Sequence, residues 1–331
     1  MPDTTCNHQS PPPNGHEEPD RNPAYRTKNN PWRGNSGSPR STTLAGRIRA
    51  AARLVKAPLT ATAALPAICA YVLAAPETSV AILLALTAGT LLAGFGASAL
   101  NQWSEHSRDA VMVRTRERPI PAGQLRPAPV LLIGLALATA GVLILFAYFS
   151  FSASVLAAAT VVLYWLVYTP LKVRTPWCTE AGAVAGAMPA LIGSAAAAGH
   201  VTASGFVLFS LLFFWQMPHF HPIAWRYRDD YRQGGFRMLA VIDPTGDRAA
   251  RRAWIYTWCM VAASLSPLLL WAGWLYGTAV AAVSVPFVWQ AAAFRKREHR
   301  DLAAPLLFKI SIVYLCVLLA ALLLDHVSGG F

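Results

Sequence analysis

The chain of 331 residues has few charged side chains, because Asp, Glu, Lys and Arg together make up only 13% of it. A soluble domain carries about 25%. Hydrophobic residues reach 55%, and the mean hydropathy is +0.39. This composition excludes an ordinary soluble domain and indicates a protein that lies within a membrane.

Paired cysteines are also lacking. The five cysteines are scattered, and no two of them form a CxxC pair. Four of them lie in or beside apolar runs, where cysteine behaves as a small apolar residue. The pattern therefore excludes a disulfide framework and a cysteine-rich zinc site.

No apolar core follows Met1, so we do not expect a secretory signal. Residues 1–45 are polar and rich in Pro, Asn, Ser and Arg, which predicts a disordered cytoplasmic tail. Acidic residues at Asp3, Glu17, Glu18 and Asp20 disfavour a mitochondrial transit peptide, since such peptides avoid acids. The sequence thus favours a bacterial inner membrane over the mitochondrial inner membrane, with one membrane domain spanning residues 46–331.

Nine apolar runs follow the tail, and each is close to the ~20 residues that a helix needs to cross a bilayer. The runs are continuously apolar and show no period of two, which excludes transmembrane strands. We therefore predict an all-α, polytopic membrane protein with about nine transmembrane helices. The runs cover residues 57–75, 80–100, 127–148, 150–169, 181–199, 203–220, 253–274, 277–294 and 306–324.

Basic residues are missing from every second loop between these runs. All 28 Lys and Arg lie before the first run, in the alternate loops, or at the start of the ninth run, at Lys309. The positive-inside rule then places the N-terminus in the cytoplasm and the C-terminus outside. Because the basic residues fall in short segments between apolar runs, the net charge of +12 does not indicate nucleic-acid binding. The loops without Lys or Arg are short, so we expect any site at the cytoplasmic end.

The first polar stretch, Asn101–Arg126, follows the second apolar run directly. If the helix continues, Asn101, Glu105 and Asp109 fall at i, i+4 and i+8 and share one face. Carboxylate and amide oxygens suit Mg²⁺, and arginines nearby suit a phosphate group. A solvated loop with loose ion pairs is the alternative interpretation.

The second polar stretch, Trp215–Asp247, mirrors the first. It places Asp229 and Asp230 among arginines just after the sixth apolar run. Two such acidic loops facing each other would clamp a diphosphate through Mg²⁺. A third piece, Tyr168–Gly182, adds Lys172, which is either a phosphate ligand or a charge that sets topology.

Two histidines, His219 and His221, lie inside the second polar stretch. On a helix they point in different directions, so a metal site shared between them is not expected. A histidine near a helix end is more often a hydrogen-bonded structural residue than a haem ligand or an acid–base group.

Together the three stretches resemble the UbiA superfamily of membrane prenyltransferases and, within it, the branch that farnesylates haem. The first motif is matched by Asn101, Glu105 and Asp109, with Glu where many members have Asp. Arg108 stands where an acidic or neutral residue is more usual. The remaining matches are Ala110, Met112, Arg114, Thr115, Arg118 and Pro119, the Tyr168–Lys172 element, Trp215–Phe220, and Asp230–Tyr231.

The resemblance implies a UbiA-like helix bundle that joins farnesyl diphosphate to a vinyl group of haem b, giving haem O and diphosphate. It implies Asn101, Glu105, Asp109 and Asp230 as catalytic residues. Mg²⁺ would be held by Glu105, Asp109 and Asp230, with Asp229 as a weaker candidate. It also implies that Arg114, Arg118 and Lys172 bind the diphosphate, and that His219, His221 and Arg226 are the candidates for haem. Haem A synthase and oxidase assembly proteins are the partners implied, beside the lipid bilayer.

Two other functions stay open at this point. A prenyltransferase acting on an aromatic quinone precursor would share the acidic motifs, and only the Pro-His-Phe and Asp-Tyr elements argue against it. The other is a haem carrier or a transporter without catalysis. A transporter would need polar residues lining a route through both leaflets, whereas here they gather at one end.

Overall fold

The computed structural model describes residues 43–75 and 77–329, and within these ranges every regular element is helical. The predicted tail lies almost wholly outside the described residues, and a helix already begins at Leu44. The elements are α1 (Leu44–Leu54), α2 (Ala57–Ala74), α3 (Val80–Asp109), α4 (Pro127–Tyr148), α5 (Phe151–Val162), the π-helix η2 (Leu163–Tyr168), α6 (Thr169–Leu171), α7 (Cys178–Ala198), α8 (Ala203–Arg226), α9 (Arg228–Gln233), α10 (Leu239–Ile242), α11 (Asp247–Leu270), α12 (Trp274–Arg295), the 3₁₀-helix η3 (Arg297–His299) and α13 (Arg300–Val327).

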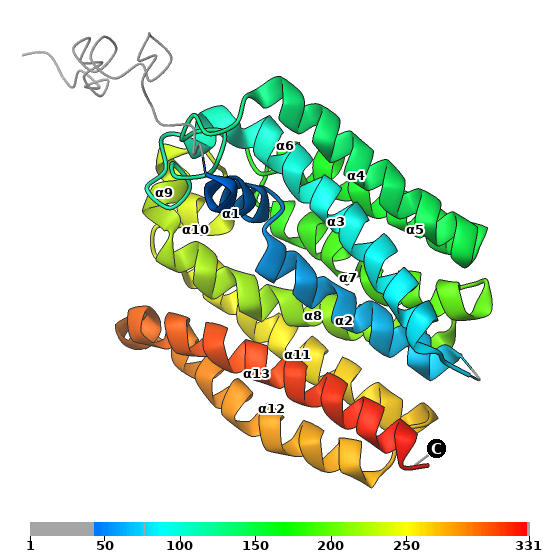
Figure 1. The fold of residues 1–331 in the computed structure, drawn as a ribbon. Coiled ribbons are helices and arrows are strands. Elements are labelled where there is room, and N and C mark those ends of the chain that lie inside the picture. The colour runs from blue at the N-terminus through cyan, green and yellow to red at the C-terminus, as the bar shows by residue number, and fades with distance from the viewer. Residues whose placement is uncertain (1–42, 76, 330–331) are drawn as a thin grey trace, which may run out of the picture. The chain divides into compact units, whose positions relative to one another are not determined.

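Nine helices in the described part of the chain are long and apolar enough to cross a membrane. They run alongside one another from residue 57 onward (Figure 1). The fourth of them is composite, because α5, η2 and α6 join into one span over Phe151–Leu171. The predicted fold class and the nine predicted spans are thereby confirmed.

The closest packing in the bundle joins α3 and α4 through glycines. A Cβ atom on Gly96 would lie 2.4 Å from the backbone nitrogen of Ala138, and one on Gly141 would lie 2.4 Å from that of Ala93. Real Cβ atoms do not approach a backbone atom so closely. Such small-residue contacts let helices associate in lipid, where burial of apolar surface gives no advantage. The seam fixes the direction of α3, which carries the acidic face.

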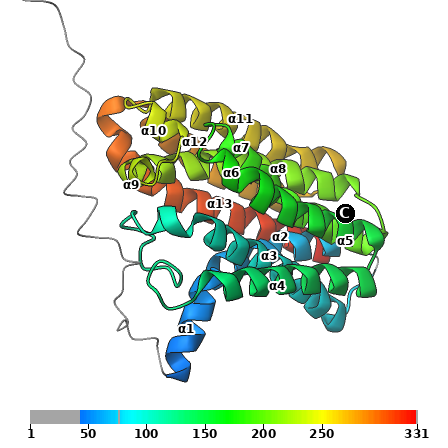
Figure 2. The same ribbon diagram turned by 90° about the horizontal axis from the view of Figure 1, so that it is seen from above.

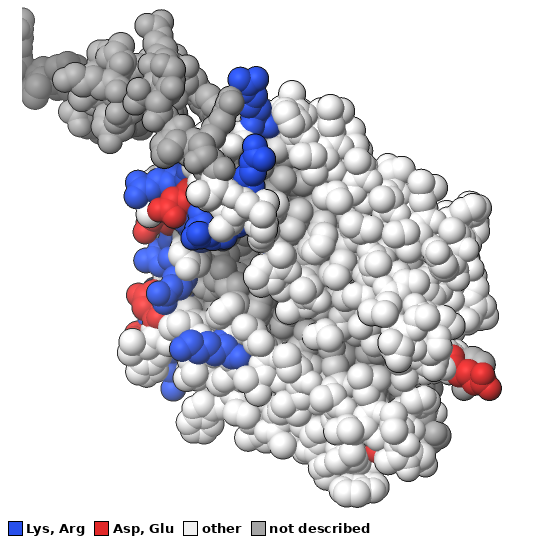
Figure 3. All heavy atoms as spheres, viewed as in Figure 1, with Lys and Arg blue, Asp and Glu red and all other residues white. Residues whose placement is uncertain are grey.

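Charged side chains gather at one end of the bundle, called the polar end below (Figure 3). The segments at this end, residues 110–126, 172–177, 227–246 and 296–299, link α3 to α4, α6 to α7, α8 to α11 and α12 to α13. The opposite end shows acidic side chains but no Lys or Arg in this view. The loops that carry Lys and Arg in the sequence therefore lie at the same end of the folded bundle.

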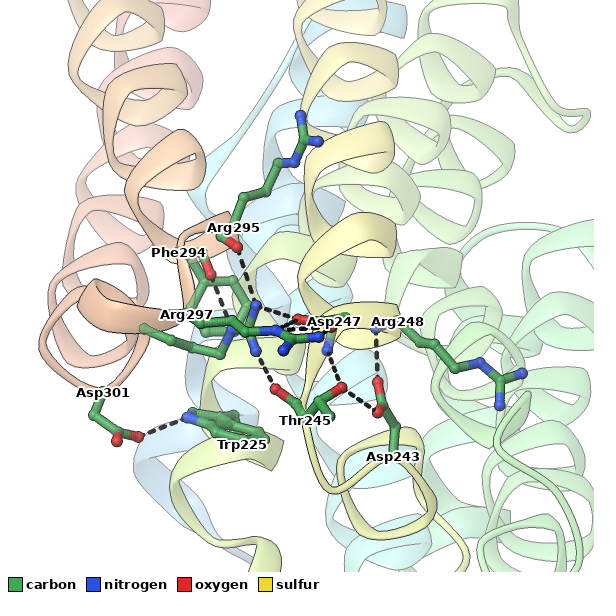
Figure 4. Close-up of polar contacts among 10 residues, drawn as sticks. Trp225, Asp243, Thr245, Asp247, Arg248, Phe294, Arg295, Arg297 and Asp301 are labelled. Atoms are coloured by element: carbon green, nitrogen blue, oxygen red, sulfur yellow. Dashed lines mark hydrogen bonds and ion pairs between the residues drawn. The ribbon is translucent and has the colours of Figure 1, made fainter.

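A buried arginine, Arg300, ties the end of the second polar stretch to the α12–α13 hairpin. Figure 4 shows its partners, Thr245 and Asp247 on one side and Phe294 and Arg295 on the other. Its guanidinium donates to the carbonyl of Thr245, to the Asp247 carboxylate at 3.0 Å, and to the carbonyls of Phe294 and Arg295 at 3.2 and 3.0 Å. The Trp225 indole also donates to Asp301 at 2.7 Å. A charged donor satisfied by several acceptors at once holds these loops firmly.

Candidate active site

The three predicted residues on α3 lie on one buried face of the helix. The thirty-residue helix begins at the N-cap Ser79 and runs without a break to Asp109, well beyond the ~20 residues that cross a bilayer. Asn101, Glu105 and Asp109 are 0%, 5% and 0% exposed. An amide and two carboxylates buried together need polar partners, and the other polar segments supply them.

Glu105 forms a two-pronged ion pair with Lys172, which directly follows α6. The Lys172 Nζ donates to both carboxylate oxygens, at 2.8 and 3.0 Å. Burial alone would lower the pKa of Lys172, but the nearby Glu105 carboxylate outweighs it and raises the pKa above its ordinary value. The Lys172 Nζ also lies 4.5 Å from the centre of the Tyr168 ring. Lys172 is thus held protonated beside the acidic face.

Asp109 pairs with Arg118, which the segment after α3 folds back toward the helix. The Arg118 Nη1 donates to Asp109 Oδ2 at 2.6 Å, and the Thr115 hydroxyl donates to the Asp109 carbonyl at 3.0 Å. The second carboxylate oxygen, Asp109 Oδ1, is buried without a hydrogen-bond partner. A buried carboxylate oxygen without a partner is costly, so this atom is ready to accept a ligand.

The second polar stretch docks onto the first. The Arg114 amide donates to Asp230 Oδ2 at 3.0 Å, and the Arg114 guanidinium donates to the Tyr231 hydroxyl at 3.1 Å. Arg108 reaches the Gly234 carbonyl at 3.0 Å. The Lys172 carbonyl accepts from the Arg237 amide at 2.7 Å, which joins the third polar piece to the same assembly. The structure thus brings all three polar segments together around the end of α3.

Asp229 behaves differently from its neighbour Asp230. Its side chain is 69% exposed and pairs with Arg232 at 2.6 Å on the same short helix, α9. Asp230 is half-buried and faces the first polar stretch through its contact with Arg114. The resemblance had already made Asp229 the weaker candidate, whereas composition and spacing did not separate these two adjacent acids.

The donor set suits a hard cation such as Mg²⁺, which prefers carboxylate, amide and water oxygens. Among the described residues, no three His, Cys, Asp or Glu side chains are gathered as a ready metal site. Instead, each carboxylate on α3 is balanced by one cation. The unpartnered oxygen of Asp109 is the feature that fits a metal ligand.

Lys56 is a site residue that the sequence reasoning missed. It precedes α2, and it is the only non-glycine residue in the described part of the chain with a positive φ, of 49°. Its Nζ donates to Asn101 Oδ1 at 3.1 Å, while Asn101 Nδ2 donates to the Thr169 hydroxyl at 3.0 Å. Burial lowers the pKa of Lys56. Asn101 therefore links the start of α2 to α6 across the acidic face.

Gln102, next to Asn101, holds the backbone that carries Lys56. The Gln102 amide donates to the carbonyls of Arg53 and Leu54 at 2.8 and 2.7 Å. A left-handed backbone costs a non-glycine residue about 1–2 kcal/mol and persists where the surroundings hold it. The sequence signal was weak, because a lysine directly before an apolar run is expected from the positive-inside rule alone.

A cavity of about 360 Å³ opens beside Glu105 and Arg108. Trp103, Trp165 and Phe236 give it aromatic walls. The Trp165 indole donates to the Ser104 hydroxyl at 2.8 Å. Trp165 lies in the π-helix η2, a rare turn that often occurs at functional sites. An apolar cavity beside charged groups suits a ligand with a charged head and an apolar body.

The three haem candidates do not meet at one point. His219 Nδ1 lies 2.6 Å from the Ser311 hydroxyl of α13, and its ring stacks on Trp215 with 4.6 Å between ring centres. His221, two residues further along α8, is buried and its Nε2 has no hydrogen-bond partner. The two rings leave the helix about 160° apart. Arg226 is exposed at the end of α8. A role for any of them toward haem stays a prediction.

Comparisons with known proteins give one consistent result. The model of the UbiA prenyltransferase family matches residues 63–313. A protein named protoheme IX farnesyltransferase from Opitutus terrae is 42% identical over 275 residues, which cover 82% of this chain and 93% of that protein. A protein of the same name from Solibacter usitatus is 39% identical and covers 72% of this chain and 82% of its own length.

Solved structures match the fold over most of the chain. A structure described as digeranylgeranylglyceryl phosphate synthase superimposes with a TM-score of 0.71 at 15% identity, and covers 85% of this chain and 99% of that one. A UbiA homolog from Archaeoglobus fulgidus bound to GPP and Mg²⁺ gives a TM-score of 0.59 at 12% identity, with 82% and 99% covered. At such low identity these likenesses show the fold alone.

Proposed function

The chain belongs to the UbiA prenyltransferase family, and from this premise we propose that it transfers farnesyl from farnesyl diphosphate to a vinyl group of haem b. The products are haem O and diphosphate. The observation that carries the proposal is the buried acidic face of α3, bordered by cations and covered by the second polar stretch. The names of the relatives from Opitutus terrae and Solibacter usitatus support haem as the acceptor.

The diphosphate binds where cations already border the acids. Lys172 and Arg118 lie within hydrogen-bond distance of Glu105 and Asp109, and the Arg114 guanidinium lies at the same end of the bundle against Tyr231. Lys56 adds a fourth cation beside Asn101. These groups would stabilise the charge that develops on the leaving diphosphate.

Mg²⁺ is the cation that this donor set fits, with Glu105, Asp109 and Asp230 as its ligands and Asn101 orienting them. The buried, unpartnered Oδ1 of Asp109 supports this assignment. When bound, Mg²⁺ would act as a Lewis acid that offsets the negative charge of the diphosphate. The solved relative from Archaeoglobus fulgidus that binds GPP and Mg²⁺ has the same fold.

The chemistry breaks the C1–O bond, the π bond of the vinyl group and one O–H bond of water, and it forms one C–C bond and one C–O bond. The C1–O bond of farnesyl diphosphate breaks, and its electron pair leaves with the diphosphate. The vinyl group of haem attacks C1 through its terminal carbon, which leaves a cation on the adjacent carbon. Water adds there and its proton passes to solvent, which gives the hydroxyethylfarnesyl group. The apolar bundle shelters the allylic cation from early hydrolysis.

Haem would approach from the α8 side. His219, which stacks on Trp215 and contacts the tilted ring of Phe308, is the candidate iron ligand, and Arg226 is the candidate partner of a propionate. This chain is an integral membrane protein, and we place it in a bacterial inner membrane with its polar end and N-terminus in the cytoplasm and its C-terminus outside. Haem A synthase and oxidase assembly proteins are the partners that such a product needs.

The test is mass spectrometry of haem extracted after incubation of the purified protein with haem b, farnesyl diphosphate and Mg²⁺. We expect a haem heavier by one farnesyl group and one hydroxyl group, because the vinyl group becomes a hydroxyethylfarnesyl group, and we expect this product to be absent when EDTA is added. Unmodified haem from folded protein, with transfer to an aromatic quinone precursor instead, would reassign the acceptor. Absence of diphosphate release with any prenyl donor and acceptor would refute a transferase.

A further inference from the structure

The first helix, α1, lies crosswise to α2, α3 and α4 at the polar end of the bundle (Figure 2). Its N-cap is Thr43, whose hydroxyl accepts from the Gly46 amide at 3.2 Å. One side of the helix is buried against the bundle through Ala50 and Leu54. A helix placed crosswise at the end of membrane spans lies roughly in the plane of the membrane surface.

The outward side of α1 carries an apolar stripe. Leu44 and Ile48, one helical turn apart, are 74% and 60% exposed. Ala51 and Val55 continue the same side at the next turns, since residues three and four apart line one face. Leu59, in the first turn of α2, is exposed as well. Large apolar side chains in this arrangement are unfavourable in water and suit the boundary between lipid headgroups and acyl chains.

Arginines flank the stripe on both sides. Arg47 lies at one edge, and Arg49 and Arg53 lie beyond the other; all three are exposed. Residues 43–56 contain no acidic residue. A hollow of about 290 Å³ opens between Arg49, Arg53 and Gln124. Two guanidinium groups beside an amide are suitable partners for a phosphate oxygen.

We propose that α1 is an interfacial helix that binds acidic phospholipid at the polar end of the protein. The apolar stripe enters the acyl boundary, and the lipid phosphate lies against Arg49 and Arg53. The arguments for this occupant are the purely positive charge of the helix and its packing against α2 and α3, two of the nine apolar spans in the described part of the chain. This inference goes beyond the proposed prenyl transfer and does not rest on it.

Lipid binding at α1 would act close to the active site. The last carbonyls of α1 are held by Gln102 of α3, and Lys56 follows two residues later with its Nζ on Asn101. Movement of α1 therefore displaces the backbone that places Lys56. Binding of α1 to an anionic membrane surface would therefore keep Lys56 in contact with Asn101.

The first experiment measures where α1 lies, without turnover. The full-length protein, with its cysteines replaced by alanine, receives a nitroxide at Ile48→Cys and is placed in nanodiscs of phosphatidylcholine and phosphatidylglycerol. Leu59→Cys is the lipid control and Asp229→Cys the water control. We expect the label at position 48 to match position 59 in its collision rates with oxygen and a water-soluble nickel complex. Rates matching position 229, or shielding from both reagents by another part of the chain, would overturn the proposal.

The second experiment tests the charge. Native mass spectrometry counts the phosphatidylglycerol retained by the Arg49→Gln/Arg53→Gln double variant and by an Arg116→Gln/Arg174→Gln control with two other exposed arginines removed. One arginine near an acidic surface is worth about fivefold in affinity, so we expect a loss of about 25-fold in the first variant only. Equal retention in both variants, or displacement of the lipid by inorganic phosphate, would overturn the lipid assignment.

Discussion

The buried ion pair between Lys172 and Glu105 offers a prediction in which stability and turnover separate. Lys172→Met leaves the Glu105 carboxylate buried without the two hydrogen bonds of 2.8 and 3.0 Å that now neutralise it. Removing one partner of a buried pair costs about 3–5 kcal/mol of unfolding free energy. Replacing both charges, as Lys172→Met with Glu105→Gln, leaves no buried unpaired charge and should restore most of that loss.

Turnover should not recover in the double variant. The proposed role of Lys172 is a charge-assisted contact to the diphosphate, worth about 1.5–3 kcal/mol, or about 10- to 100-fold in rate. Glu105 is also a proposed metal ligand, so the loss in the double variant should be at least as large. If the Lys172–Glu105 pair only stabilised the fold, turnover would be lost in Lys172→Met and would recover together with stability in the double variant.

The assay pairs reversible unfolding in mixed detergent micelles, followed by circular dichroism, with turnover of the folded protein. Arg252 and Glu180 provide a matched control, because they form a second ion pair of low exposure at 2.6 Å between α11 and α7. The control double variant should keep its turnover. The reasoning is refuted if Lys172→Met is as stable as the wild type, or if the Lys172–Glu105 double variant regains turnover.

Four further predictions follow from named contacts. Asp109→Asn should lower turnover about 100-fold or more while the protein stays folded, whereas Asp229→Asn, an exposed acid, should not; steady-state rates of the two variants decide this. Burial lowers the pKa of Lys56, so wild-type turnover should fall as pH rises through that lowered pKa, and Lys56→Arg, which stays charged, should hold its rate to higher pH; identical pH profiles would remove Lys56 from the site. His219→Ala should weaken haem binding, followed by absorbance titration, and leave the KM for farnesyl diphosphate unchanged, and a change in turnover alone would show that it is not an iron ligand. Gly141→Ala should cost about 1–3 kcal/mol of unfolding free energy, because its Cβ would meet the backbone of α3 at 2.4 Å; an unchanged unfolding curve would contradict the close packing.

The acidic face could be predicted because it depends on local geometry. Asn101, Glu105 and Asp109 share a face once the helix continues, and nothing far away in the chain is needed to place them. The nine spans were equally predictable, since each is read from its own length and composition. The sequence predicted only that the two acidic loops would face each other. It did not predict that Asp230 would contact Arg114 of the first polar stretch.

Other parts of the site depend on contacts between distant segments. Lys56 contacts Asn101, 45 positions away in the sequence, from a left-handed backbone conformation. No local sequence pattern predicts this contact. Asp229 and Asp230 are adjacent and have the same side chain, and it is the rotation along α9 that leaves Asp229 exposed while Asp230 contacts Arg114. The π-helix carrying Trp165 was not predicted either, because it differs from an α-helix by one backbone register rather than by residue type.

Arg300 has a consequence for how the protein is made. It begins the last span, yet it fixes the loop that ends the second polar stretch. A chain that leaves the ribosome from its N-terminus has inserted α3 and α8 long before Arg300 emerges. Until then the acids are present without the clamp that arranges their loop. Activity should therefore appear only after Arg300 has been synthesised. A chain truncated before the α12–α13 hairpin would carry every acidic motif and be inactive.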